Sequence, residues 1–200
     1  MSKKLLKGGA MLAPVPAVMV SVGDGETKNV LTVAWCGTVA TTPPKTYISV
    51  RPSRYSYDII KRTGEFVINL VPSSMARKAD YCGIFTGAKV DKFEKCGLTA
   101  TPIEGVSAPA IAECPLSIAC RVTDVIPMGT HDMFLADVVA VAADDALFDE
   151  KGAIHFERAD LCAYVHGAYF KLGKEIGKFG FSAVKKKKKR GGKKDGKSKD

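Results

Sequence analysis

The residues best suited to chemistry in this chain gather around one proline, in the segment R-P-S-R-Y-S at 51–56. This segment follows an apolar run and precedes a short helical pattern, so its side chains fall where a strand ends and a helix begins. Guanidinium groups, hydroxyl donors and the free N–H groups of a helix N-terminus together bind phosphate well. The same composition also fits an exposed loop in which Ser53 or Ser56 caps the helix.

A second group of residues surrounds the only tryptophan of the chain, Trp35, in the run N-V-L-T-V-A-W-C-G at 29–37. Gly37 follows closely, and a glycine beside an aromatic residue lets main chain approach a flat ligand. A core tryptophan next to a β-bulge would give the same pattern. Both interpretations stay open from this run alone.

Two further segments are ambiguous when taken singly. The segment K-V-D-K-F-E-K-C-G at 89–97 is typical of a charged, solvated turn. The segment G-T-H-D at 129–132 places His131 directly after a turn, at the start of a long apolar run. A lone histidine is more often structural than functional, so this position alone assigns no role.

The elements that must position these residues are mostly strands. Apolar or β-branched runs separated by turn residues predict strands at 15–22, 30–34, 47–50, 66–71, 116–126, 133–143 and 161–170. Pro127-Met128-Gly129 predicts a hairpin connection, and helical patterns occur only at 56–62 and at 73–83. Many short strands with a few short helices favour a mainly β fold, a closed or partly closed β-barrel.

The formal net charge of +9 is concentrated at the end of the chain. Residues 185–200 hold ten Lys/Arg and two Asp, whereas residues 1–184 hold twenty Lys/Arg and nineteen Asp/Glu. We therefore predict one folded domain over 1–184 and a disordered lysine-rich tail over 185–200. The tail permits non-specific contact with nucleic acid, although no aromatic residue is interleaved with its lysines.

Several function classes are disfavoured by what the sequence lacks. It has no apolar run long enough for a membrane span and no export signal, so we expect a cytoplasmic protein without membrane contact. Its six cysteines include no C-x-x-C pair, and we expect them to be reduced thiols buried as small apolar groups. With three histidines and no Cys/His cluster, no metal site is expected. Dinucleotide, Walker and nucleophile-elbow motifs are also absent.

Taken together and in order, these segments resemble the flavoredoxins, members of the flavin reductase-like, FMN-binding split-barrel family. The resemblance covers roughly residues 10–170. It rests on N-V-L-T-V-A-W-C-G at 29–37, T-P-P at 42–44, R-P-S-R-Y-S at 51–56, G-E-F-V-I-N at 64–69, K-F-E-K-C-G at 92–97 and G-T-H-D at 129–132. It implies a six-stranded antiparallel split barrel with a few short helices, which forms a homodimer and binds FMN near the subunit interface.

The resemblance also assigns roles by matching position. It implies that Ser53, Arg54 and Ser56 bind the phosphate, with Arg51 in support. It also implies that Lys92 adds positive charge at the phosphate or ribityl end. His131 lies beside the isoalloxazine ring where reductant or substrate arrives, and is the catalytic candidate. The remaining cofactor-binding positions, at the ring or the ribityl chain, are Asn29, Thr32, Trp35, Cys36, Gly37, Thr38 and Tyr164.

One departure from the family pattern bears on function. Many flavin reductases carry a glycine six residues after the histidine, where this chain has Asp137. The difference favours the flavoredoxin branch, an oxidoreductase that transfers electrons through bound FMN. An NAD(P)H-dependent flavin reductase is the alternative, so the partner is NAD(P)H or a redox protein. A more remote alternative is nucleic-acid or surface binding by the lysine tail, with the barrel as a scaffold.

Overall fold

The computed structural model describes residues 1–183, so the tail predicted over 185–200 lies outside the described residues. The strands are β1 (Val15–Pro16), β2 (Val18–Gly23), β3 (Lys28–Val33), β4 (Cys36–Thr41), β5 (Pro44–Val50), β6 (Glu65–Leu70), β7 (Ala100–Thr101), β8 (Ala110–Ile111), β9 (Leu116–Pro127), β10 (Asp132–Ala143), β11 (Cys162–Val165) and β12 (Ala168–Lys171). The helices are α1 (Tyr55–Thr63), α2 (Ala76–Ile84) and α3 (Lys92–Cys96), with short 3-10 turns η1 (Ser73–Met75), η2 (Asp145–Leu147), η3 (Phe156–Ala159) and η4 (Phe181–Ala183).

Seven strands form one antiparallel sheet in the order β3-β2-β6-β9-β10-β5-β4. The sheet curls until β3, one edge strand, approaches β5 near the other edge. Edge strands β3 and β4 are joined by Ala34 and Trp35, and the main-chain oxygen of Trp35 accepts a hydrogen bond of 2.8 Å from Ser49 N–H on β5. The result is a mainly β, antiparallel split barrel that opens beside this connection.

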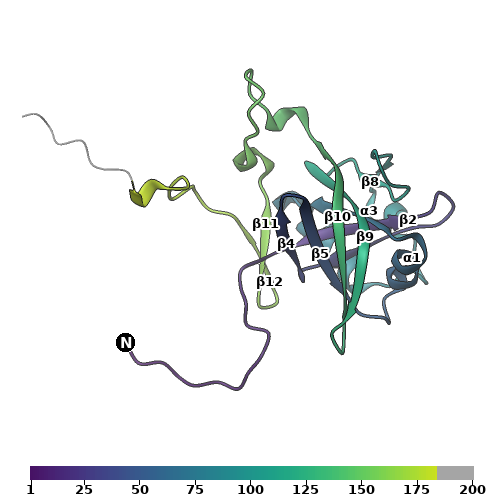
Figure 1. Cartoon of the computed structure of the whole chain (residues 1–200), viewed down its shortest axis with the longest axis horizontal. Helices are drawn as coiled ribbons and strands as arrows, with labels where there is room; N and C mark the ends of the chain where they lie inside the picture. The colour runs from purple at the N-terminus through teal and green to yellow at the C-terminus, as the bar shows by residue number, and fades with distance from the viewer. Residues whose placement is uncertain (184–200) are drawn as a thin grey trace, which may run out of the picture.

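Smaller units cover the barrel. Strands β1, β11 and β12 form a separate antiparallel sheet, which lies on the side from which the N-terminal arm extends (Figure 1). Inside the barrel, apolar side chains such as Phe66 and Phe134 are fully buried. A second apolar cluster, including Met19 and Phe93, fills the space between the sheet and helices α2 and α3. Burying both faces of the central strands in this way fixes the sheet against the helices that carry polar site residues.

Most predicted strands and both predicted helices form within a few residues of their expected limits, and the 127–129 connection joins β9 to β10. The single strand predicted at 161–170 is wrong, because a turn divides it into the hairpin of β11 and β12. The sheet has one strand more than the six implied by family resemblance, because 36–41 also pairs with β5. The predicted helix at 73–83 begins as a 3-10 turn. No helix described within residues 1–183 is long and apolar enough to cross a membrane.

Two other local predictions are wrong. The N-cap residue of α1 is Arg54 rather than Ser53 or Ser56, and no side chain caps the helix. Within the segment 89–97, predicted as a solvated turn, residues 92–96 form α3. The first two residues of this helix, Lys92 and Phe93, are buried. The apolar cluster under α3 accounts for this difference, since Phe93 packs into it and draws the helix against the barrel.

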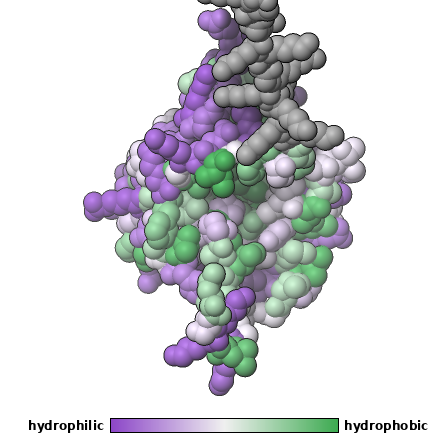
Figure 2. Space-filling view, turned by 90° about the vertical axis from the view of Figure 1, so that its left-hand side faces the viewer, coloured by the Kyte–Doolittle hydropathy of each residue, from purple (hydrophilic) through white to green (hydrophobic). Residues whose placement is uncertain are grey.

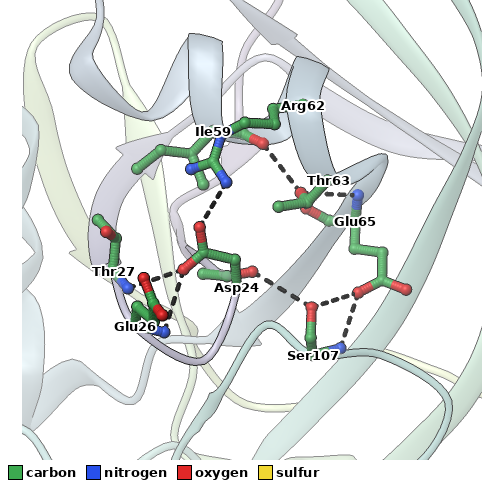
Figure 3. Close-up of polar contacts among 9 residues, drawn as sticks. Asp24, Glu26, Thr27, Ile59, Arg62, Thr63, Glu65 and Ser107 are labelled. Atoms are coloured by element: carbon green, nitrogen blue, oxygen red, sulfur yellow. Dashed lines mark hydrogen bonds and ion pairs between the residues drawn. The ribbon is translucent and has the colours of Figure 1, made fainter.

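The C-terminal end of α1 is held by a polar network far from the R-P-S-R-Y-S segment (Figure 3). Asp24, in the β2–β3 turn, accepts a 2.7 Å hydrogen bond from Thr27 N–H and forms an ion pair with Arg62 on α1. The Thr27 and Arg62 contacts hold the pKa of Asp24 at about 2. Ser107 connects the same turn to Glu65, the first residue of β6.

A histidine outside the site makes one loop sensitive to pH. His155 Nε2 lies 3.0 Å from Asp149 Oδ2, and its Nδ1 lies 2.8 Å from Glu157 Oε1. Hydrogen bonds to Asp149 and then Glu157 raise the pKa of His155 above its usual 6.5. The contribution of the ion pairs to stability is therefore complete below pH 6.5 and lost as pH rises through the higher folded-state pKa.

We expect amide hydrogen exchange in residues 149–157 to accelerate, relative to the barrel strands, as pH rises through that folded-state pKa. The measurement is exchange protection against pH, corrected for intrinsic rates. In His155→Gln the pH-dependent part should vanish. Equal pH dependence in both proteins would contradict the assignment.

Candidate functional site

A small polar cavity lies where β3, the start of α1 and the loop after α2 meet. Asn29 on β3 is almost completely buried, and its Nδ2 donates a 2.7 Å hydrogen bond to Ser56 Oγ, which is fully buried on α1. The cavity measures about 170 Å³. Its lining comprises Asn29, Leu31, Arg51, Ser53, Arg54, Tyr55, Ser56, Phe85, Thr86, Gly87 and Lys92. Two guanidinium groups, an ammonium and hydroxyl donors make it an anion site.

Lys92 is the buried cation of this cavity, with 3% of its surface exposed. Its Nζ donates hydrogen bonds of 2.8 Å to the main-chain oxygens of Val30 and Cys82. An ammonium group has three N–H bonds, so one is left for a ligand. Burial lowers the pKa of Lys92 from 10.5 to about 8, and the positive charge of Arg54 contributes to this. A buried ammonium is costly unless an anion compensates it, which is what the cavity can accept.

The loop between α2 and α3 forms another wall of this cavity. Gly87 lies so close to the cavity that an added Cβ would be 2.3 Å from Asn29 Oδ1 and 2.7 Å from Tyr55 Cδ1. Arg54 Nη1 donates a 3.0 Å hydrogen bond to the main-chain oxygen of Gly83, at the end of α2. The loop is therefore packed onto the start of α1 through a position where a side chain has no space.

A second cavity, of about 310 Å³, lies at the opening of the barrel between β3 and β5. It is lined by Leu31, Thr32, Val33, Ala34, Trp35, Ser49, Val50, Arg51, Arg54 and His131. Leu31, Arg51 and Arg54 line both cavities, so the two adjoin. The Thr32 hydroxyl donates to the main-chain oxygen of Ala79, which holds β3 against α2. The pair of cavities forms a slot with an anion site at one end and Trp35 and His131 at the other.

His131 is a neutral imidazole at neutral pH. Burial, followed by the charges of Arg51 and Arg54, lowers its pKa below 6.5. Its Nε2 lies 3.4 Å from Arg51 Nε, and its Nδ1 lies 2.9 Å from Thr130 Oγ1. Because Arg51 can only donate, Nε2 is the acceptor and we assign the proton to Nδ1. His131 and Arg51 thus orient each other across the mouth of the slot.

An apolar cavity of about 460 Å³ adjoins the slot at Trp35 and His131. Leu12, Met128 and Met133 contribute to its lining, and so does Cys36, whose pKa burial raises to about 12. Tyr164 lines two other cavities on the side of Trp35 that faces the small sheet. Trp35, 38% exposed, separates these spaces, so its indole can present one face to the slot and the other to a second molecule.

Not all predicted site residues lie together. Gly37 and Thr38 are on β4 and line none of the five cavities described above. The space above Gly37 is taken by the Tyr47 ring, 3.2 Å from where a Cβ would be. Asp137 pairs with Lys45 across β10 and β5. It is roughly 17–20 Å along the strand from His131, too far to act on the slot directly.

Some residues that line these cavities are not among the site residues predicted from the sequence. Phe85, Thr86 and Gly87 close the anion cavity, and Met128 and Met133 wall the apolar one. The spacing of Gly83 and Gly87 around I-F-T was the available signal, because glycines mark close approach of main chain. The spacing of the glycines does not show which segment approaches the loop, so it did not identify the residues that the loop contacts.

Comparisons with known proteins agree on one family. Residues 11–173 match the model of the flavin reductase like domain. A flavoredoxin of Desulfovibrio vulgaris (Miyazaki F) superposes with a TM-score of 0.84 at 29% identity, covering 91% of this chain and 99% of that one. A flavoredoxin from Methanosarcina acetivorans gives 0.82 at 25% identity, covering 92% and 100%. An NADPH-flavin oxidoreductase of Streptomyces viridifaciens is 26% identical over 139 residues, 67% of this chain and 69% of that protein.

Proposed function

The chain belongs to the flavin reductase-like family, and from this premise we propose that it is an oxidoreductase that transfers electrons through a bound FMN. Flavin-related redox function is common to the family and its named relatives. Our proposal is narrower in three respects: the flavin is FMN, it stays bound during turnover, and the protein acts as a flavoredoxin-type carrier. The flavin reductase alternative differs in the electron donor and in releasing reduced FMN.

The observation that carries the proposal is the slot itself. Its closed end gathers Arg54, Ser56 and Lys92 around a cavity large enough for one phosphate, and its open end offers Trp35 and His131. A flavin mononucleotide has a phosphate at one end and a flat ring at the other. The length of the slot lies along β3, whose residues line both ends.

The closed end favours FMN over other flavins. The loop at Gly87 packs against the start of α1 beside a cavity of about 170 Å³, which leaves little room for the adenosine monophosphate portion of FAD. Riboflavin lacks the phosphate and would leave Lys92 without a compensating charge. We therefore expect affinity to decrease in the order FMN, then FAD and riboflavin, in equilibrium titrations followed by flavin fluorescence.

When bound, the flavin supplies the redox chemistry, and the protein supplies binding, orientation and a local field. Lys92, Arg54 and Ser56 hold the phosphate end and fix the register of the ring along β3. Arg51 places a positive charge beside His131, which favours added negative charge in the slot. His131 is neutral, and its Nε2 accepts a hydrogen bond from Arg51. It therefore lies at the ring end of the slot without adding a charge there.

The electron donor distinguishes the two versions of the function. Mixing the FMN-loaded protein anaerobically with NADH or NADPH in a stopped-flow instrument follows bleaching of the flavin absorbance. For a carrier we expect neither nucleotide to bleach the flavin at a catalytically useful rate, whereas chemical reduction by dithionite bleaches it fully. Rapid bleaching by either nucleotide would assign the flavin reductase alternative instead.

We also propose a homodimer in the cytoplasm. The face bearing the small sheet and the N-terminal arm carries green hydrophobic areas between purple hydrophilic ones (Figure 2). Exposed apolar residues include Leu12, Met128 and Phe170. Apolar exposure of this kind is typical of an interface, and a second copy covering it would complete the wall at Trp35. Light scattering that gave a monomeric mass at micromolar concentration would contradict the dimer.

The pKa of Lys92 predicts how FMN affinity depends on pH. Below its pKa of about 8 the ammonium is charged and ready to receive the phosphate. Above this pH, binding must restore a proton to Lys92, so affinity should fall by up to about tenfold per pH unit. The Lys92→Met variant should bind FMN weakly at pH 7 and lose this pH dependence. Titrations between pH 7.5 and 9.5 measure both, and a flat profile for the unmodified protein would be incompatible with this role.

A further inference from the structure

Two cysteines meet at the base of the loop that closes the anion cavity. Cys82 on α2 and Cys96 at the end of α3 lie 14 positions apart in sequence, and their Sγ atoms are 3.9 Å apart. All six cysteines are free thiols. Within residues 1–183, no other two cysteine sulfurs are in such contact. A disulfide needs the sulfurs to approach by about 2 Å, which side-chain rotation with small helix shifts supplies.

The position of this pair links it to the flavin slot. Residues 83–95, between the two cysteines, include Gly87 at the cavity wall and Lys92 at its closed end. The main-chain oxygen of Cys82 accepts one of the Lys92 hydrogen bonds. Lys92 and Cys96 are the first and last residues of the same short helix, α3. A bond between the sulfurs would therefore close this segment into a ring that includes the cavity wall.

We propose that Cys82 and Cys96 form a thiol–disulfide exchange site for small disulfides, and that oxidation locks the 83–95 segment over the phosphate end of bound FMN. The inference concerns the same site as the proposed function and rests on it for its effect on FMN. Formation of the disulfide itself does not depend on flavin.

The exposure of the two thiols sets the order of reaction. Cys96 is half-buried and reachable, whereas Cys82 is fully buried, and burial raises the pKa of Cys82 to about 12. The Cys96 thiolate attacks a small disulfide RSSR, which forms a mixed disulfide and releases RS⁻, the acceptor of the Cys96 proton. The Cys82 sulfur then displaces the second RS⁻ from Cys96 and gives it a proton. In total, two protein thiols are oxidised and RSSR is reduced to two RSH.

The expected consequence is slower loss of FMN. Phe85, Thr86 and Gly87 form one wall of the anion cavity, and this wall lies between the two cysteines in the sequence. Cross-linking the base of a loop removes open conformations from its ensemble. With both thiols free, Arg54 and Lys92 already hydrogen-bond the main-chain oxygens of Gly83 and Cys82, so we expect the disulfide to stabilise this same arrangement.

The test uses the full chain loaded with FMN and treated with oxidised glutathione under air-free conditions. We expect two of the six thiols to be lost, with a Cys82–Cys96 link in non-reducing peptide mass spectrometry. FMN dissociation into excess apoflavodoxin should slow at least threefold, and dithiothreitol should reverse this. Trypsin cleavage after Lys89, an exposed residue of the loop, should also slow after linkage, and it is measured separately on the flavin-free protein.

Two variants complete the test. Cys96→Ser should abolish both the link and the slowing, while leaving FMN binding by the reduced protein unchanged. Cys120→Ser is the control, because Cys120 is buried in the barrel core away from other sulfurs. A link between other cysteines, retention of all thiols, or unchanged trypsin cleavage after linkage would overturn the inference. Cleavage is scored without flavin, so a protein that binds no FMN would refute the proposed function separately.

Discussion

Replacing Arg54 and Ser56 together by alanine is expected to weaken FMN binding at least a hundredfold. Arg54 lines both adjoining cavities, and Ser56 is fully buried beside the phosphate end. A hydrogen bond to a charged group contributes about 1.5–3 kcal/mol, so losing two such bonds costs about 3–6 kcal/mol. This corresponds to a reduction of roughly 100-fold to 10,000-fold in affinity, measured by titration of the apoprotein with FMN.

Arg62→Ala provides the matched control for charge and helix. Arg62 is on α1 too, but at its C-terminal end, where it pairs with Asp24 on the surface. Its removal lowers the net charge by the same amount and should leave FMN affinity within about twofold, because a surface ion pair contributes little. If the double variant bound FMN as tightly as the unmodified protein, the phosphate assignment would be wrong.

Gly87→Ala is expected to have the second largest effect, although it adds a single methyl group. The new Cβ would lie 2.3 Å from Asn29 Oδ1 and 2.7 Å from Tyr55 Cδ1. Asn29 cannot retreat, because it is buried and hydrogen-bonded to Ser56. The loop must therefore move away from α1, which opens the closed end of the slot. We expect FMN affinity to fall at least tenfold and the apoprotein to lose about 1–3 kcal/mol of stability.

Gly173→Ala is the companion variant, since a Cβ there meets nothing within 4 Å. Its FMN affinity and thermal unfolding should match those of the unmodified protein. Full FMN affinity in Gly87→Ala alone would remove the loop from the account of the site.

The parts of the site that depend on local sequence could be predicted. In R-P-S-R-Y-S a strand ends and a helix begins within six residues, so the direction of Arg54 and Ser56 follows from nearby backbone. The hairpin at 128–131 likewise places His131 at the mouth of β10 from local turn chemistry. The backbone that carries these residues is set by local turns, which is why pattern and composition suffice to place them in sequence.

The parts that depend on distant packing could not. Lys92 is surrounded by charged residues in sequence, which predicts solvent exposure, yet its helix packs on β3 and α2 through Phe93. The role of Gly87 could not be predicted either, because it depends on close approach to Asn29 and Tyr55, which are 58 and 32 positions earlier in the chain. The order of motifs across the family supplied Lys92 as a site residue, and no motif supplied Gly87.

The central claim, that this chain binds FMN in the slot along β3, is tested most directly by adding FMN to the purified apoprotein. Visible absorption and flavin fluorescence, followed by gel filtration, measure what stays with the protein. The account predicts one FMN per chain retained through the column, with its fluorescence changed by Trp35, and little retention by the Arg54→Ala, Ser56→Ala variant. A protein that leaves the column colourless after incubation with excess FMN would contradict it.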